Sequence, residues 1–131
     1  MLVIDANIVL EVLYRRSRWK ESKELLDRIK RGELSACMLQ FAMHGISAML
    51  GKPELVSTFL REILSWRGLE VRDLSVEEEV VAAELAREVG LDFDDCLHYY
   101  LAKKVGAAIV SFDKDFDDLD VRRLEPLDIL T

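Results

Sequence analysis

Short, wholly apolar runs that alternate with longer stretches of helical periodicity limit the folds open to this chain. Residues 1–4 and 107–111 show no polar and apolar alternation, which is typical of strands buried on both faces of a parallel sheet. Residues 34–37 and 69–71 are predicted to form further strands, and 122–130 an edge strand. The sequence therefore predicts several short strands, most of them without a solvent-facing side.

Helical patterns fill the segments between these strands. The predicted helices begin at Asn7, span residues 17–32 and 39–50, run from Pro53 to about residue 68, and cover 75–89 and 94–104. Ser75 with Glu78 has the spacing of a capping box. Because crossovers between parallel strands are right-handed, this order predicts an α/β three-layer sandwich, with a central, mostly parallel sheet and helices on both faces.

The composition predicts one domain over residues 1–131. Half of the residues are hydrophobic, and six glycines with two prolines leave no flexible linker. The two cysteines have no metal-type spacing and predict buried thiols in the reducing cytoplasm, in agreement with the lack of a signal sequence. The uncharged stretch 34–51 contains several polar residues and glycines, so we expect no membrane span.

The charge balance limits how the chain can meet a polyanion. Eighteen basic and 25 acidic residues give a net charge of −7, so the overall field repels nucleic acid. Any contact with nucleic acid must then be local. The candidates are the basic segment around Arg15, Arg16 and Arg18, with Trp19 and Lys20, and the isolated Lys114 in an acidic turn. A plain surface turn is the alternative for the basic segment.

Aspartates stand where predicted strands end or a helix begins. Asp5 and Asp113 follow two strands, and Asp95 lies at a helix start. The carboxyl ends of parallel strands meet at one edge of the sheet, so the three side chains are predicted to converge. Three carboxylates about 5 Å apart repel by roughly 10 kcal/mol in total at an effective dielectric of 20. Oxygen ligands of this kind select Mg²⁺ or Mn²⁺, and Mg²⁺ commonly takes phosphate oxygens as further ligands.

Three sequence blocks resemble those of PIN-domain nucleases, especially the VapC-like toxin branch: DAN at 5–7, DDCLH at 94–98 and SFDKDF at 111–116. The resemblance implies an endoribonuclease that hydrolyses phosphodiester bonds with Mg²⁺ or Mn²⁺, forms a homodimer and binds an antitoxin protein. It also implies that Asp5, Asp95 and Asp113 are catalytic metal ligands, that Asn7 and Ser111 support them, and that Asp94 is a neighbour.

One position departs from the family pattern. The family carries a glutamate on the helix after the second strand, where this chain has Gly45. The loss of a ligand predicts one metal in place of two, or weaker binding. His44 and Glu11 are the candidates to compensate. The alternative is a catalytically impaired PIN-like module that binds or regulates a partner.

The same residues fit other functions less well. A phosphotransferase with Asp5 as nucleophile is disfavoured, because such enzymes usually have a second aspartate where this chain has Asn7. His98 lies one helical turn after Asp95, where contact with substrate is the alternative, but beside the apolar stripe of its helix it is expected to be structural. The remaining acids of the turn 113–120 are expected to be solvated. The Met-rich segment 38–49 is expected to fill the core; with Phe59, Leu60 and Trp66 it is also the predicted contact for a second copy or an antitoxin.

Overall fold

A computed structural model describes residues 1–131 and shows a five-stranded sheet in the order β3-β2-β1-β4-β5, with every neighbouring pair parallel. The strands are β1 (Leu2–Ile4), β2 (Ala36–Leu39), β3 (Leu69–Arg72), β4 (Ala108–Val110) and β5 (Arg123–Leu124). The helices are α1 (Ala6–Leu13), α2 (Trp19–Lys30), α3 (Gln40–Leu50), α4 (Pro53–Ser65), α5 (Val76–Val89), α6 (Phe93–Val105) and α7 (Pro126–Leu130). The predicted α/β sandwich is confirmed, and the sheet is entirely parallel.

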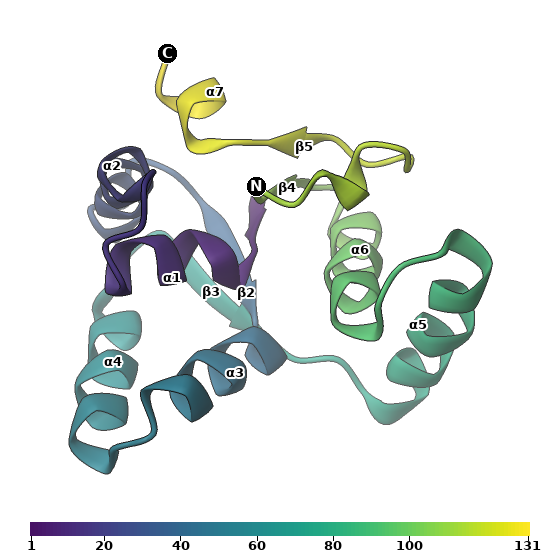
Figure 1. The fold of residues 1–131 in the computed structure, drawn as a ribbon, viewed down its shortest axis with the longest axis horizontal. Helices are drawn as coiled ribbons and strands as arrows, with labels where there is room; N and C mark the ends of the chain where they lie inside the picture. Colours follow the sequence, from purple (N-terminus) through teal and green to yellow (C-terminus); the bar gives the residue numbers. More distant parts are fainter.

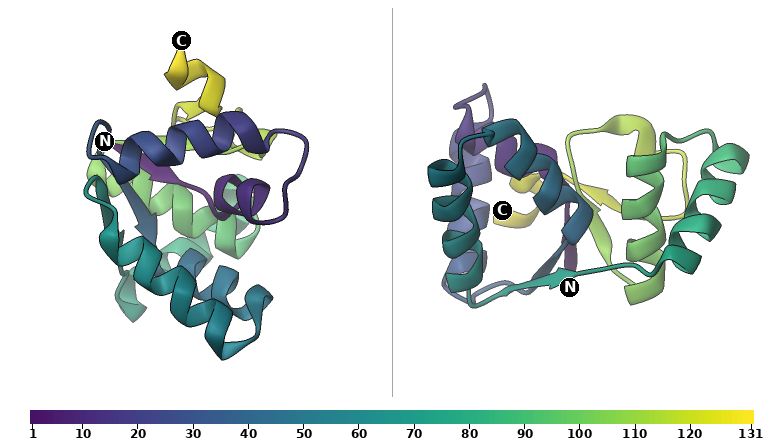
Figure 2. Two further views of the ribbon diagram at one scale, coloured as in Figure 1. Left: turned by 90° about the vertical axis from the view of Figure 1, so that its left-hand side faces the viewer. Right: turned by 90° about the horizontal axis from the view of Figure 1, so that it is seen from below.

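Helices cover the two faces of the sheet unequally. Helices α1 to α4 lie on one side, and α5 with α6 on the other (Figure 1). The views in Figure 2 show the same separation into three layers. The chain adds β2 and β3 on one side of β1, then returns to place β4 and β5 on its other side. This reversal lies between β1 and β4, where an open parallel sheet leaves its crevice for ligands.

The central strands carry the core. Val3, Ile4, Ile109 and Val110 are fully buried, and Val3 faces Ile109 across the β1–β4 ladder. Twenty-six buried residues form one hydrophobic cluster. Both strands of the crevice are therefore held rigidly, and so are the residues that directly follow them. No helix combines the length and hydropathy needed to cross a membrane, and the uncharged stretch 34–51 is β2 followed by α3.

The expectation of an edge strand over 122–130 is wrong for most of its length. Strand β5 holds only two residues, and Pro126 then begins α7, which packs on α2. Proline has no N–H for a sheet ladder and suits the first helical position. Glu125 and Asp128 form a capping box there. The predicted box of Ser75 and Glu78 on α5 is confirmed.

Candidate metal centre

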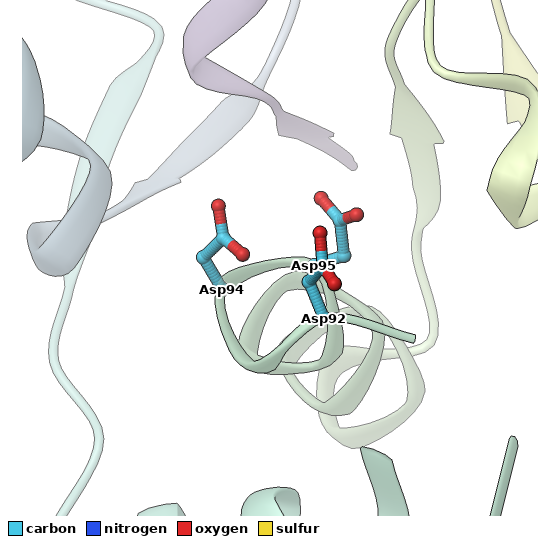
Figure 3. A group of neighbouring side chains, drawn as sticks. All are labelled: Asp92, Asp94 and Asp95. Atoms are coloured by element: carbon cyan, nitrogen blue, oxygen red, sulfur yellow. The ribbon is translucent and has the colours of Figure 1, made fainter. Parts of the chain in front are cut away.

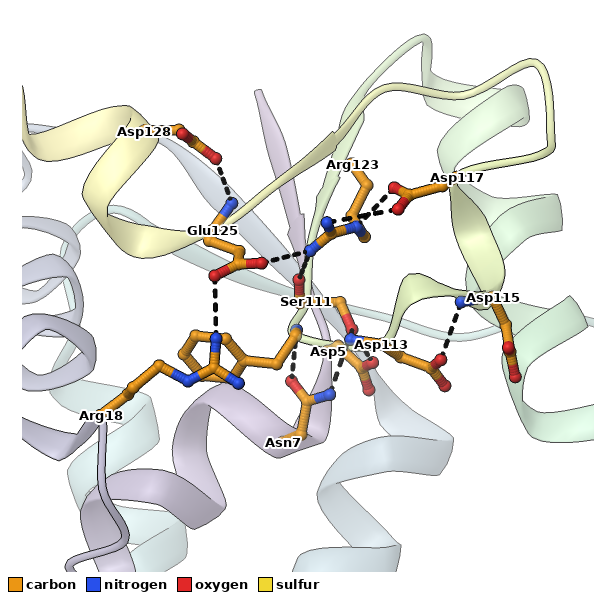
Figure 4. Close-up of polar contacts among 11 residues, drawn as sticks. Asp5, Asn7, Arg18, Ser111, Asp113, Asp115, Asp117, Arg123, Glu125 and Asp128 are labelled. Atoms are coloured by element: carbon orange, nitrogen blue, oxygen red, sulfur yellow. Dashed lines mark hydrogen bonds and ion pairs between the residues drawn. The ribbon is translucent and has the colours of Figure 1, made fainter.

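A buried serine joins the ends of β1 and β4. Asp5 follows β1 and is 8% exposed, and Ser111 follows β4 and is fully buried. The Ser111 hydroxyl donates to Asp5 Oδ2 at 2.6 Å and accepts from the Asn7 amide at 3.1 Å and the Asp113 backbone N–H at 3.0 Å. Figure 4 shows these side chains meeting where the two strands end. The structure thus brings Asp5, Asn7, Ser111 and Asp113 together.

Helix α6 adds carboxylates to this edge. Oxygens of Asp95, Asp113 and Asp115 all lie within 4.8 Å of one another, and so do oxygens of Asp92, Asp94 and Asp95. Figure 3 shows this second group at the start of α6. Asp5 is in neither group, but its charge contributes to the raised pKa of Asp95. Asp95 is the shared member, so it is the centre of the acidic cluster.

The electrostatics of the cluster disfavour ionisation of Asp95. Burial is the main cause, followed by repulsion from Asp113, Asp94, Asp5 and Asp92, and together they raise the pKa of Asp95 to about 7. A carboxylate whose ionisation is disfavoured by burial and by like charges is neutralised by a proton or by a cation. The arrangement therefore has the character of a cation site.

An arginine network holds the loop that carries Asp113. The Arg123 guanidinium donates to the Ser111 carbonyl at 3.0 Å, to Glu125 at 2.8 Å and to Asp117 at 2.6 Å. Arg18 pairs with the other oxygen of Glu125 at 2.9 Å, and its guanidinium carbon lies 3.9 Å from the centre of the Phe112 ring. Figure 4 shows the network above the acidic site. Arg18 and Asp117 therefore have structural partners.

A family profile matches the part of the chain that forms this site. The profile described as "PIN domain" matches residues 2–122, which contain the whole acidic cluster. The chain belongs to the PIN domain family. The predicted family membership is thereby confirmed. The comparison with curated proteins found no match.

Solved structures share the PIN fold of this chain at low sequence identity. A chain of a toxin–antitoxin complex from Klebsiella pneumoniae aligns with a TM-score of 0.76 and 13% identity, over 96% of this chain and 98% of that one. VapC20 of Mycobacterium tuberculosis, a toxin that cleaves the sarcin–ricin loop, aligns with 0.72 and 17%, over 93% and 99%. VapBC2 of Rickettsia felis, bound to a promoter DNA fragment, aligns with 0.70 and 14%, over 95% and 97%.

Neither residue considered as a substitute for the family glutamate reaches this PIN site. Glu11 is buried, and its Oε2 accepts from the Arg18 backbone N–H at 3.0 Å, so it holds the turn between α1 and α2. His44 is exposed on α3. A Cβ built on Gly45 would meet nothing within 4 Å. A side chain at position 45 would therefore have open space around its Cβ.

The predicted RNA-contacting cations differ in their surroundings. Arg15, Arg16 and Lys114 are exposed, and none of them takes part in an ion pair of the structure. The guanidinium of Arg15 lies 4.9 Å from the centre of the Trp19 ring, and that of Arg16 lies 5.6 Å from the Tyr14 ring. Lys114 directly follows Asp113. All three are free to meet phosphate groups.

Sequence reasoning missed three members of the site. Asp115 was expected in a solvated turn, but the Asp115 backbone N–H donates to Asp113 Oδ1 at 2.9 Å and its carboxylate joins the cluster. Asp92 precedes α6 and was not considered. His98 is 4% exposed, and its Nε2 lies 4.0 Å from Asp5 Oδ1. The spacing of His98 one helical turn after Asp95 was a signal for this position.

The apolar surface predicted as a contact has two parts. Phe59 and Trp66 line a cavity of about 240 Å³, together with Val9, Val12 and Leu26 of α1 and α2. On α3, Phe41 and Met49 are exposed, whereas Ala42 and Ile46 are buried. Phe41 meets Phe93 edge to face, with ring centres 6.3 Å apart. Helix α3 thus combines the predicted core filling with an exposed apolar side.

Proposed function

We propose that this PIN domain is a metal-dependent endoribonuclease acting on RNA phosphodiesters, with residues 1–131 acting as one domain. The observation that carries the proposal is the convergence of Asp95 with Asp113 and Asp115 beside the β1–β4 switch point. Burial, together with repulsion from the neighbouring carboxylates, raises the pKa of Asp95 there to about 7. A cation bound at this cluster would offset the free-energy cost of keeping these carboxylates ionised and close together.

The donor set fits a hard divalent cation. The cluster offers carboxylate oxygens and no thiolate, because both cysteines are buried in the core and neither belongs to the two groups of converging ligand atoms. Carboxylates suit Mg²⁺ and Mn²⁺. Asp5, Asp95 and Asp113 would hold the ion, and Ser111 with Asn7 would orient two of them through the bonds described above. Such hydrogen-bonded support is what fixes a ligand geometry.

The residues around the cluster take defined roles in this proposal. A bound divalent ion would activate water and offset negative charge on the reacting phosphate. Arg15, Arg16 and Lys114 supply unpaired positive charge for flanking RNA phosphates. These contacts are local, as the net charge of −7 requires. Ser111 keeps Asp5 oriented, with Oδ1 left open to the site.

A partner protein is part of the proposal. Structures with this fold include toxin–antitoxin complexes, and the chain is proposed to be a cytoplasmic toxin that forms a homodimer and is neutralised by an antitoxin. The exposed apolar side chains of α3 and the cavity beside Phe59 and Trp66 are the proposed contact surfaces. Co-expression with the neighbouring open reading frame, followed by co-purification, tests this partnership.

A second function is favoured by one observation. Gly45 stands at the position of the expected glutamate and leaves open space there. A PIN domain that lacked this ligand and bound metal too weakly for catalysis would act as a binding or regulatory module. Activity assays on variants separate the two functions.

The decisive assay measures cleavage of unstructured RNA with Mn²⁺ or Mg²⁺. If the protein is an active nuclease, the parent cleaves the RNA, the variants Asp5→Ala and Asp113→Asn do not, and Asp118→Asn still does. Asp118 is the matched control, an exposed acid of the same turn outside the cluster. Cleavage by Gly45→Glu alone identifies an impaired module. No cleavage by any variant across RNAs of varied sequence contradicts the nuclease proposal.

A further inference from the structure

His98 carries a buried nitrogen with no partner. The side chain lies on α6 and is 5% exposed, and its Nε2 is one of three buried polar side-chain atoms without a hydrogen bond. An unsatisfied buried polar group costs about 1–3 kcal/mol. A position that keeps such a group beside an acidic cluster points to a ligand that completes it.

The hydrogen bond of the other ring nitrogen, Nδ1, determines the tautomer of His98. Nδ1 lies 2.8 Å from the backbone carbonyl oxygen of Asp94. A carbonyl only accepts hydrogen bonds, so Nδ1 carries a proton, and in a neutral imidazole with this tautomer Nε2 presents a lone pair. Histidines that bind metals commonly have this arrangement, with one nitrogen donating to a carbonyl and the other facing the ion.

The lone pair faces the open oxygen of a proposed metal ligand. Asp5 Oδ2 accepts the Ser111 hydroxyl, whereas Oδ1 has no hydrogen bond and lies 4.0 Å from His98 Nε2. Two atoms that bind one ion at about 2.1 Å each can be at most about 4.2 Å apart. The separation is within this limit, so the distance allows His98 and Asp5 to hold the same ion.

The surrounding space is open to an ion. Asp5, Asp94 and His98 line a cavity of about 160 Å³ together with Gly45 of α3, and its other walls are apolar. A Cβ at Gly45 would meet no atom within 4 Å. Position 45 of α3 therefore contributes no side chain to this cavity.

We propose that His98 Nε2 binds the divalent ion together with Asp5, so that the ligand absent from Gly45 on α3 is supplied by α6. This inference rests on the metal centre of the proposed function but not on RNA cleavage. An imidazole ligand favours Mn²⁺ over Mg²⁺. Mg²⁺ prefers oxygen ligands, whereas divalent transition metals such as Mn²⁺ also bind nitrogen. The site is accordingly selective for Mn²⁺.

The direct test is pulsed electron paramagnetic resonance of the Mn²⁺-loaded protein, without RNA and with any histidine tag removed. A coordinated imidazole gives a ¹⁴N coupling on Mn²⁺. The chain has two histidines, and the second, His44, is exposed on α3. We expect the ¹⁴N coupling in the parent and in His44→Gln and its loss in His98→Leu. The His44→Gln spectrum decides the question even if His98→Leu does not fold.

Calorimetry gives an independent measure. His98→Leu is expected to lower Mn²⁺ affinity at least about tenfold and Mg²⁺ affinity much less, with His44→Gln unchanged. Gly45→Glu combined with His98→Leu is expected to recover binding with a preference for Mg²⁺, since the new ligand is oxygen. A parent without ¹⁴N coupling, unchanged Mn²⁺ affinity in His98→Leu, or no Mn²⁺ binding by the parent would overturn the proposal. Metal binding through His98 without RNA cleavage would refute only the nuclease function.

Discussion

Replacing Asp95 by asparagine is predicted to stabilise the metal-free protein. The pKa of Asp95 is raised from its usual 3.8 to about 7, which corresponds to about 4 kcal/mol against the charged form. Asp95 is only about half-buried, so solvent screening reduces this penalty to about 2 kcal/mol. The substitution also removes a negative charge from the first turn of α6, worth about 0.5–1 kcal/mol. The expected net gain is about 1 kcal/mol at pH 8.

The sign of the pH dependence follows from the direction of the shift. The folded state binds the Asp95 proton more tightly than the unfolded state, so stability falls as pH rises from about 4 to about 7 and is then constant. The variant lacks this contribution. Its advantage over the parent should therefore be absent near pH 4 and complete at pH 8.

Urea denaturation in the presence of EDTA, followed by circular dichroism at several pH values, measures both quantities. Asp118→Asn, the exposed acid of the same turn, is the control and should not change stability at pH 8. Adding Mn²⁺ at a hundred times its dissociation constant should stabilise the parent by about 2.7 kcal/mol and the variant by much less, so that the order reverses. Equal or lower stability of Asp95→Asn in EDTA at pH 8, or equal stabilisation of both proteins by Mn²⁺, would refute this reasoning.

Three further substitutions test the support of the site and the fold. Ser111→Ala leaves Asp5 Oδ2 and two donors without their shared partner, so we expect a loss of about 2–3 kcal/mol in urea denaturation and about tenfold weaker Mn²⁺ binding by calorimetry. Gly68→Ala places a Cβ 2.1 Å from the Leu34 carbonyl oxygen and should cost about 3 kcal/mol, whereas Gly45→Ala should gain about 1 kcal/mol; equal effects would contradict the packing argument. Ser75→Ala removes the α5 cap and should lower stability by about 1 kcal/mol, as thermal unfolding would show; an unchanged melting temperature would contradict the role of the cap.

The fold was predictable where burial dictates the residue pattern. The wholly apolar runs at β1 and β4 are buried on both faces, so they carry the signature of a parallel sheet. The convergence of Asp5 with Asp113 follows from the same fact, because Asp5 directly follows β1 and Asp113 lies three residues after the end of the neighbouring β4. The end of the chain was predicted wrongly, because Pro126 ends the strand after two residues and begins a helix.

The remaining part of the site depends on contacts between side chains that spacing does not encode. Asp115 looked like one more acid of a solvated turn, and only the turn closed by its N–H on Asp113 brings its carboxylate to Asp95. Glu11 looked like a possible ligand because it lies one turn after Asn7. The fold instead directs its carboxylate to the Arg18 backbone. In both cases the partner is set by a local loop rather than by periodicity.

Gly45 and His98 show why a motif read along the chain gives an incomplete ligand set. A metal ion requires ligand atoms at suitable positions around it, and these atoms can come from any helix that borders the site. Helices α3 and α6 both border the cavity beside Asp5, so a donor lost from one can be replaced from the other. Sequence position suggested a vacancy at Gly45, and helical spacing suggested a core residue at His98. The free nitrogen at His98 became visible only once its hydrogen bond to Asp94 and its distance from Asp5 were known.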